Sequence, residues 1–182
     1  SSACAKPDGT KIYWIKENGI EVYTVSTNSF VYKSFTSPLV APSFDNSQNV
    51  CYFGKNNDLI VVQRSSQNII KIVKSSDEGT SWTQIGSDIP VVSPQHIHSW
   101  GSYSRAYFSI RESDCTVKIY KITYNGTAYQ YKLIRTFTGI SVSVLYNIRF
   151  ATFTTKVPSN PTPYCIMLNA TVKRFILFDC ES

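Results

Sequence analysis

Two histidines, separated by one residue, are among the side chains in this sequence best suited to chemistry. His96 and His98 would point to the same face if they lie on a β-strand, because strand side chains alternate between the two faces. Two imidazoles on one face could form half of a zinc or copper site. The nearest further ligands are Glu112, Asp114 and Cys115, and none of them is adjacent. We therefore expect a solvent-facing or hydrogen-bonded histidine pair, and we predict no metal and no cofactor.

A second concentration of polar side chains is the segment SSDEGTSW, from Ser75 to Trp82. A calcium loop needs alternating oxygen ligands over roughly twelve residues, and a carboxylate pair on adjacent strand positions would point to opposite faces. The pattern instead predicts a turn. We expect Asp77 to accept hydrogen bonds from backbone N–H groups two and three residues on. Gly79 would supply a positive φ, and Trp82 would pack back across the hairpin.

The elements that position these residues are predicted to be β-strands, because apolar and polar residues alternate along much of the chain. Aromatic residues make up 14% and charged residues 16% of the chain, against about 25% charged in typical globular domains. The predicted strands are residues 11–16, 20–26, 51–55, 59–64, 69–74, 105–111, 115–123, 129–137, 149–156, 163–169 and 173–179. We expect one all-β domain over residues 1–182.

The turns that follow the longest apolar strands repeat along the chain. Their polar anchors are Asn28, Asp77, Asn125 and Asn169, spaced by 49, 48 and 44 residues. This spacing fits the ~40–50 residues of a four-stranded propeller blade. It predicts a propeller-like array of about four blades of antiparallel sheet, with approximate repeats over 5–40, 41–90, 91–140 and 141–182. A β-sandwich or barrel is the alternative, because those folds also place Asn-containing turns between strands.

The pattern Ser-x-Asp-x-Gly-x-x-Trp is matched by Ser75, Asp77, Gly79 and Trp82. It resembles the Asp box, or bacterial neuraminidase repeat, of the sialidase-like and sortilin-like β-propeller family. The full motif covers eight of 182 residues, with weaker copies over 26–32 and 123–129. The resemblance implies a structural hairpin that joins the third and fourth strands of a blade, on its rim and away from a catalytic centre.

Catalysis is not expected from this resemblance. A sialidase needs an arginine cluster, a Tyr–Glu nucleophile pair and an Asp acid/base. The Arg-Ile-Pro motif that sialidases carry early is missing, since the first arginine is Arg64, and six blades of ~45 residues need a longer chain. We assign no catalytic residue. A sialidase-like glycoside hydrolase acting on anionic sugars is the alternative function.

Dispersed cysteines and glycosylation sequons favour an extracellular location, either secreted or surface-attached. Asn125 and Asn169 each begin an Asn-x-Thr sequon. Two disulfides are suggested, Cys4–Cys180 to join the first and last blades and Cys115–Cys165 between neighbouring blades. Cys51 would then be the odd cysteine, buried or intermolecular, although a sequence does not determine connectivity.

The net charge of +6 could attract nucleic acid or acidic surfaces. The charges are scattered, with no run of three consecutive basic residues, so they are expected to form a soluble basic surface without a nucleic-acid partner. The sequence also has no apolar run near the ~20 residues that a membrane span needs.

These observations together predict a non-catalytic binding module that recognises a protein or glycan partner on a host or neighbouring cell. The candidate recognition loops are residues 36–49, 86–105 and 156–163. The middle segment carries residue types that are typical of interaction hot spots, namely His96, His98, Trp100, Tyr103 and Arg105. Assembly with another chain into a larger propeller is a further alternative.

Overall fold

The structure is a computed structural model in which every regular element is a β-strand. It describes residues 3–16, 18–39, 49–54, 56–102, 105–113, 116–139, 148–154, 163–169 and 174–179. Within these ranges the strands form four antiparallel sheets, in which strands consecutive along the chain lie side by side. The same residues contain no helix that is long and apolar enough to cross a membrane.

The four sheets follow one another along the chain. The first contains β1 (Ala3–Ala5), β2 (Lys11–Ile15), β3 (Gly19–Thr24) and β4 (Ser29–Ser34). The second contains β5 (Asn49–Phe53), β6 (Leu59–Ser66), β7 (Ile69–Ser75) and β8 (Thr83–Gln84), with β9 (Ile89–Pro90) also paired to β7. The third contains β10 (His96–Ser102), β11 (Arg105–Arg111), β12 (Val117–Tyr124) and β13 (Tyr129–Phe137). The fourth contains β14 (Ile148–Thr154), β15 (Pro163–Asn169) and β16 (Arg174–Asp179).

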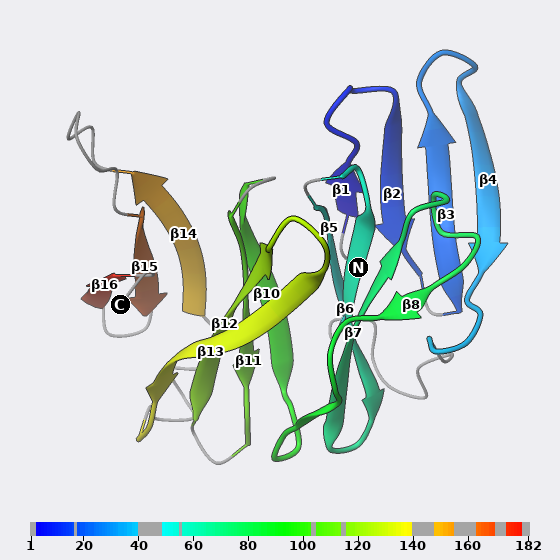
Figure 1. The fold of residues 1–182 in the computed structure, drawn as a ribbon. Coiled ribbons are helices and arrows are strands. Elements are labelled where there is room, and N and C mark those ends of the chain that lie inside the picture. The colour runs from blue at the N-terminus through cyan, green and yellow to red at the C-terminus, as the bar shows by residue number, and fades with distance from the viewer. Residues whose placement is uncertain are drawn as a thin grey trace.

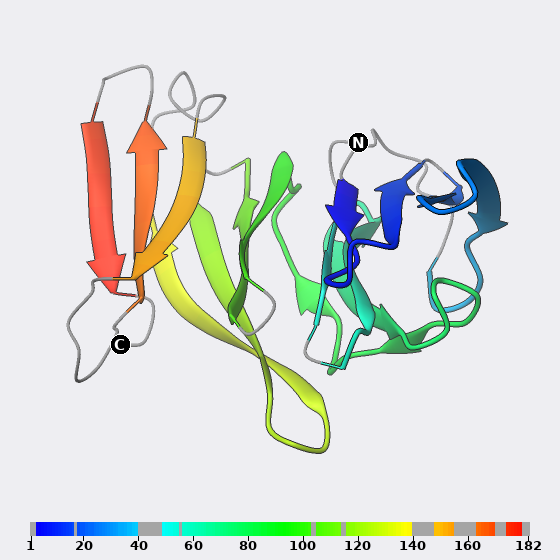
Figure 2. The ribbon, with the colours of Figure 1, turned by 90° about the horizontal axis from the view of Figure 1, so that it is seen from above.

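The sheets stand next to one another in chain order, from the blue first sheet to the orange and red fourth sheet (Figures 1 and 2). The first strand of each sheet contacts the first strand of the next, so that β1 lies by β5, β5 by β10 and β10 by β14. This arrangement confirms the predicted propeller-like array of antiparallel sheets, and it is not a pair of sheets packed as a sandwich.

Strand β6 shows how the array is held together, because all six residues from Leu59 to Arg64 are buried. Leu59 and Val61 belong to the apolar cluster shared with the first sheet, whereas Ile60 and Val62 belong to the cluster shared with the third sheet. A strand covered on both faces reads as a continuous apolar run. Sheet-on-sheet burial therefore explains why residues 59–64 show so little alternation.

The junction between the second and third sheets is centred on aromatic packing. Phe108 of β11 and Tyr120 of β12 lie directly opposite each other, with parallel rings whose centroids are 4.9 Å apart. Around them pack aliphatic side chains of the second sheet, including Ile70 and Ile72. Burial of such side chains contributes about 1.5–3 kcal/mol each, so this junction is a major source of stability.

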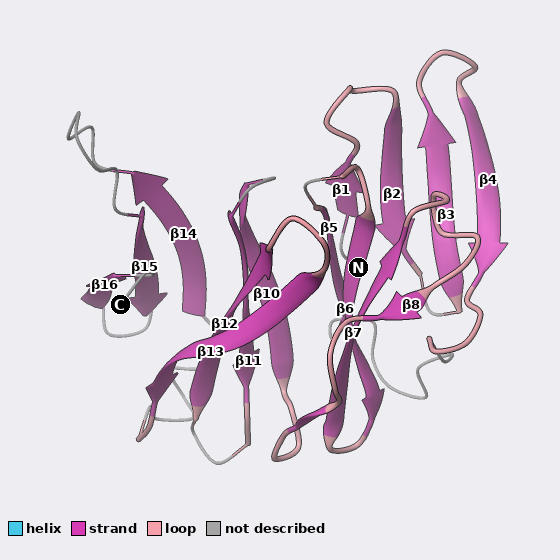
Figure 3. Cartoon of the chain, in the orientation of Figure 1, coloured by secondary structure: helices cyan, strands magenta, loops and turns pink. Residues whose placement is uncertain are grey.

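Each predicted strand range corresponds to a strand of the structure, but β1, β4, β8, β9 and β10 were not among the predicted ranges. Residues 86–105 were expected to be a loop, but they contain β9 and β10 (Figure 3). Strand β10 pairs with β11 along its whole length, from His96 opposite Arg111 to Ser102 opposite Arg105. The segment HIHSWGS shows no clean alternation of polar and apolar residues, because Ser99 falls on the same face as Ile97 and Trp100 on the same face as the histidines. The connection between the second and third sheets is therefore short.

Candidate binding surface

Strands β2 and β3 of the first sheet have one covered face and one more exposed face. Tyr13 and Val22 lie opposite each other on β2 and β3, and both are buried against the second sheet. Because strand side chains alternate between faces, Trp14 and Tyr23 point the other way. That outer face extends to β4, where Phe30 lies opposite Tyr23.

Three aromatic rings on this outer face contact one another across the strands. The ring centroids of Tyr23 and Phe30 are 4.8 Å apart, those of Trp14 and Phe30 6.0 Å, and those of Trp14 and Tyr23 6.4 Å. Tyr32, two residues beyond Phe30, lies so close over Gly19 that an added Cβ would be 2.8 Å from its ring. We call Trp14, Tyr23, Phe30 and Tyr32 the first-sheet aromatic face.

The first-sheet aromatic face is open to solvent among the described residues. Phe30 is 59% exposed and Tyr32 is 52% exposed. Polar groups lie beside the rings: the Tyr23 hydroxyl donates to Asn28 Oδ1 at 3.0 Å, and Lys16 pairs with Glu21 at 2.9 Å. A contiguous apolar patch with polar groups at its edge is typical of an interaction site.

The two histidines singled out by sequence lie on one face of the third sheet. Their ring centroids are 6.4 Å apart and the planes are tilted by 30°, while Ile97 between them is buried against the second sheet. In the register of β10 and β11, His96 lies opposite Arg111 and His98 opposite Ser109. Among the described residues, no group of three or more His, Cys, Asp or Glu side chains is placed to hold a metal ion.

The remaining members of the predicted hot spot cannot be placed beside the histidines. Trp100 lies in β10 and Arg105 begins β11, but their side chains and the whole of Tyr103 lie outside the described residues. Most of the other two candidate loops, residues 40–48 and 155–162, also lies outside them.

The segment Ser75–Trp82 forms a tight turn between β7 and β8, the third and fourth strands of the second sheet. Asp77 Oδ1 accepts hydrogen bonds from the backbone N–H groups of Thr80, at 3.1 Å, and Ser81, at 2.8 Å. The bonds therefore go to residues three and four positions on, one further than expected. Hydroxyls complete the shell, since Ser75 Oγ donates to Oδ1 and Ser81 Oγ to Oδ2. These hydrogen bonds, above all those from Ser81, hold the pKa of Asp77 well below its usual range.

Gly79 and Trp82 complete the same turn, Gly79 through its backbone and Trp82 by packing against the first sheet. Gly79 has φ +87°, and its N–H donates to Ser75 Oγ at 2.7 Å. Trp82 is buried in the core shared with the first sheet and meets Phe35 edge-on, with ring centroids 6.2 Å apart. The turn is thus part of the junction between two sheets.

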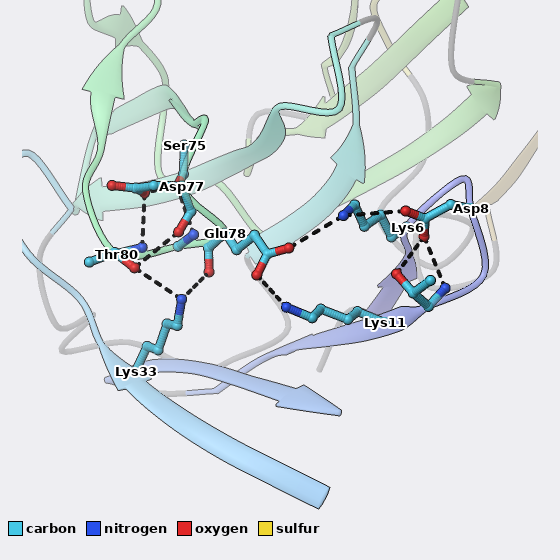
Figure 4. A network of polar contacts seen from close by, with 10 residues as sticks. Lys6, Asp8, Lys11, Lys33, Ser75, Asp77, Glu78 and Thr80 are labelled. Atoms are coloured by element: carbon cyan, nitrogen blue, oxygen red, sulfur yellow. Dashed lines mark hydrogen bonds and ion pairs between the residues drawn. The ribbon is translucent and has the colours of Figure 1, made fainter. Parts of the chain in front are cut away.

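Glu78 in this turn has a role that sequence reasoning missed (Figure 4). Its carboxylate pairs with Lys6, in the connection between β1 and β2, and with Lys11 of β2. Lys33 of β4 donates to the Glu78 carbonyl at 2.8 Å. The hydrogen bond from Lys11, together with the lysine charges, lowers the pKa of Glu78. No local pattern in the sequence brings these lysines, more than forty positions away, to the turn.

The weaker copies of the motif occupy related places in two other sheets. Asn28 lies between β3 and β4 and has φ +48°. Asn125 lies between β12 and β13 and accepts hydrogen bonds from the N–H groups of Thr127 and Ala128, both at 2.9 Å. Asn169 instead ends β15, the second described strand of its sheet. Three of the four anchors therefore mark the turn between third and fourth strands.

The sequence-based disulfide pairs remain predictions. Cys115 and Cys180 lie outside the described residues, and Cys165 lies in β15 with its side chain outside them. Cys51 is buried, 3% exposed, in the core between the first two sheets.

No protein-family model and no curated protein sequence matches this chain. Among solved structures, a mutant of the Aleuria aurantia lectin in complex with Fucα1-6GlcNAc is similar over 86% of this chain and 50% of its own, at 13% identity and a TM-score of 0.50. The WD40 domain of SCAP from fission yeast is similar over 97% of this chain and 41% of its own, at 11% identity and a TM-score of 0.47. The chain spans half or less of the length of these two structures. The likeness to the lectin supports the all-β propeller fold.

Proposed function

We propose that this chain is a non-catalytic β-propeller module that binds a protein or glycan partner through the first-sheet aromatic face. The observation that carries the proposal is the contact of Trp14, Tyr23 and Phe30 on a surface where Phe30 and Tyr32 remain more than half exposed. Exposed large apolar groups that touch one another are a marker of recognition rather than of a monomer surface.

The chemistry of this face suits a ligand with both flat apolar and polar surfaces. Aromatic rings bury large areas and present a π-face, while Tyr and Trp also offer a polar atom. Asn28 and the Lys16–Glu21 pair lie beside the rings and could orient hydroxyl or amide groups of the partner. Trp and Tyr are also the residue types that dominate binding energies at protein interfaces.

The test is a binding screen with matched surface variants. The unmodified chain is presented to a glycan array and to cells whose surface proteins are intact or removed by protease. The Phe30→Ala/Tyr32→Ala double variant should lose at least about tenfold in affinity. Leu133→Ala, which truncates an exposed apolar side chain on β13 of the third sheet (43% exposed), should bind like the parent. Equal binding by the double variant and the parent, or no binding by the parent to glycans or cells, would contradict the proposal.

A second candidate function is that of a subunit in a larger propeller assembly. One observation favours it: β6 is covered on both faces, whereas the first sheet stands at the end of the array (Figure 1) and its Phe30 and Tyr32 side chains are exposed. A further blade from a second copy of the chain would cover the first-sheet aromatic face as the neighbouring sheets cover β6. Mass measurement under native conditions tests this. We expect the parent chain to form an oligomer and the Phe30→Ala/Tyr32→Ala variant to be a monomer. A parent chain that is monomeric at high concentration would exclude the assembly.

Two finer points belong to the same proposal. The hydrogen bonds around Asp77 support a relationship between the β7–β8 turn and the Asp box.

The exposed turn at Asn125, which begins a glycosylation sequon, supports an extracellular location, with the partner displayed on a host or neighbouring cell. Expression through a eukaryotic secretory route should add an N-linked glycan that Asn125→Gln removes, and secreted protein without any glycan would contradict this point.

A further inference from the structure

Two cysteines meet at the junction between the first and second sheets. Cys4 lies in β1 and Cys51 in β5, the adjacent first strands of the two sheets. Cys51 Sγ lies 4.0 Å from the carbonyl oxygen of Tyr13, and Tyr13 is the residue directly opposite Cys4 in the β1–β2 pair. Both cysteines belong to or pack against the same apolar cluster.

The neighbouring Cys51 side chain affects the ionisation of the Cys4 thiol. The proximity of Cys51, followed by burial, raises the pKa of the Cys4 thiol far above its usual range, so Cys4 is protonated near neutral pH. A protonated, buried thiol such as Cys4 reacts slowly, because the thiolate is the nucleophile in thiol–disulfide exchange. In the folded chain the pair is therefore chemically protected in whichever redox state folding left it.

We infer that Cys4 and Cys51 form a disulfide that covalently joins the first strand of the first sheet to the first strand of the second sheet. The oxidant is a low-molecular-weight disulfide of the glutathione class, acting while the chain folds. One protein thiolate attacks the small disulfide, forms a mixed disulfide and releases one small thiol. The second protein thiolate then displaces the other small thiol. In total the protein thiols lose two protons and two electrons, and the small disulfide is reduced to two thiols.

This bond would make Cys4 unavailable to Cys180, its partner in the sequence-based prediction. The structure supports the new pairing because β1 and β5 are adjacent and both cysteines pack in or against the same apolar cluster. The bond would tie together the junction that Trp82 and Glu78 stabilise by non-covalent contacts.

Peptide mapping of the full chain, folded with a mixture of reduced and oxidised glutathione, tests the inference directly. Trypsin does not cut between Lys6 and Pro7, so Cys4 is released in peptide 1–11 and Cys51 in peptide 34–55. Without reductant we expect these two peptides to be joined. Peptide 1–11 joined to peptide 175–182, which carries Cys180, would overturn the inference, as would an unlinked, alkylatable Cys4 in the folded protein.

Variants give a second readout. Cys4→Ser should lower Tm by about 10 °C under oxidising conditions, as expected when a loop of this length loses its cross-link, and should show no difference from the parent under reducing conditions. Cys180→Ser is the matched control and should keep the 1–11/34–55 link and the parent Tm. Loss of that link in Cys180→Ser, or an unchanged Tm in Cys4→Ser, would overturn the inference. Neither readout depends on changing the buried Cys51.

Discussion

Glu78, in the turn between β7 and β8, forms a close ion pair with Lys11 of β2, and so connects the second sheet to the first (Figure 4). The turn that contains Glu78 is rich in polar side chains, and the ion pairs of Glu78 connect it to the neighbouring first sheet. Four of its residues, Ser75, Asp77, Gly79 and Trp82, shape the hairpin. Glu78 adds the electrostatic link, which makes the turn a junction element.

Glu78→Gln should lower the free energy of unfolding by about 0.5–1 kcal/mol at neutral pH. The estimate is modest because the side chain is about one-third exposed and exposed ion pairs are screened by solvent. Urea unfolding measures the change. Glu21→Gln is the matched control, since Glu21 is similarly exposed but pairs with Lys16 inside one sheet. An equal or larger loss in Glu21→Gln would contradict a special contribution of the inter-sheet pair.

The contribution of Glu78 should also depend on pH. Its pKa is lowered in the folded state, chiefly by the hydrogen bond from Lys11, so its stabilising effect is present above the unfolded pKa, near 4.5. The effect is lost as the pH falls through the lower folded pKa. The difference between parent and Glu78→Gln should therefore shrink when unfolding is measured in acid, and a difference that grows in acid would refute the assignment.

Asp77→Ala should lower the free energy of unfolding by about 1–2 kcal/mol, because two backbone N–H groups and two hydroxyls lose their acceptor. Asp77→Asn keeps an acceptor oxygen and should cost less. Binding of any still-folded protein to its partner should be unchanged, since the turn lies at a sheet junction away from the first-sheet aromatic face. Weaker binding with unchanged stability would instead make Asp77 part of the recognition site.

Gly79→Ala should be more destabilising than Gly9→Ala. Both glycines have positive φ, +87° and +72°, which costs an alanine about 1–2 kcal/mol. At Gly79 the added Cβ would also lie 3.3 Å from Ile20 Cδ1 and 3.5 Å from Trp82 Cζ2, whereas nothing lies within 4 Å at Gly9. Thermal unfolding of the two variants separates backbone strain from crowding. Equal losses of thermal stability in the two variants would show that Ile20 and Trp82 move aside for the added Cβ at no energetic cost.

Tyr120 should remain un-ionised far above the pH at which a free tyrosine titrates. Burial, then the charge of Glu112, raises its pKa to about 12. Because the unfolded phenol ionises near pH 10, folding stability should fall between about pH 10 and pH 12. Ultraviolet titration of phenolate, compared with Tyr120→Phe, measures this. A Tyr120 that ionises with the exposed tyrosines would contradict its close stacking on Phe108.

The sequence reveals those strands whose pattern is local. Strands β2, β3, β7 and β12 show alternation, and β6 shows an apolar run, so all five were expected. Strands β8 and β9 contain two residues each, too few for any periodicity. Strand β10 was missed because its sequence, HIHSWGS, mixes polar and apolar residues on both faces and resembles a loop in composition.

The candidate surface was less predictable than the strands. Strand β4, with Phe30 and Tyr32, was not among the predicted strand ranges, and nothing local indicates that its face lies at the end of the array. The meeting of Cys4 with Cys51 and of Lys11 with Glu78 depends likewise on which sheets are neighbours. Such relationships arise only once whole sheets pack together, and residue spacing does not encode them.

Strand β6 has a property that follows from its burial on both faces. A shift of the pairing register by one residue would turn Ile60 and Val62 toward the first sheet and Leu59 and Val61 toward the third sheet. Both pairs are aliphatic, so hydrophobicity alone does not define the register of β6. The alignment is fixed by polar residues just before and at the end of the apolar run. Buried Asp58 accepts a hydrogen bond from Ser76, and Arg64 donates to the carbonyls of Gln67 and Pro94. The contacts of Asp58 and Arg64 therefore favour the observed pairing register of β6. Exchanging these two residues for apolar ones would keep β6 buried but remove this preference for one register.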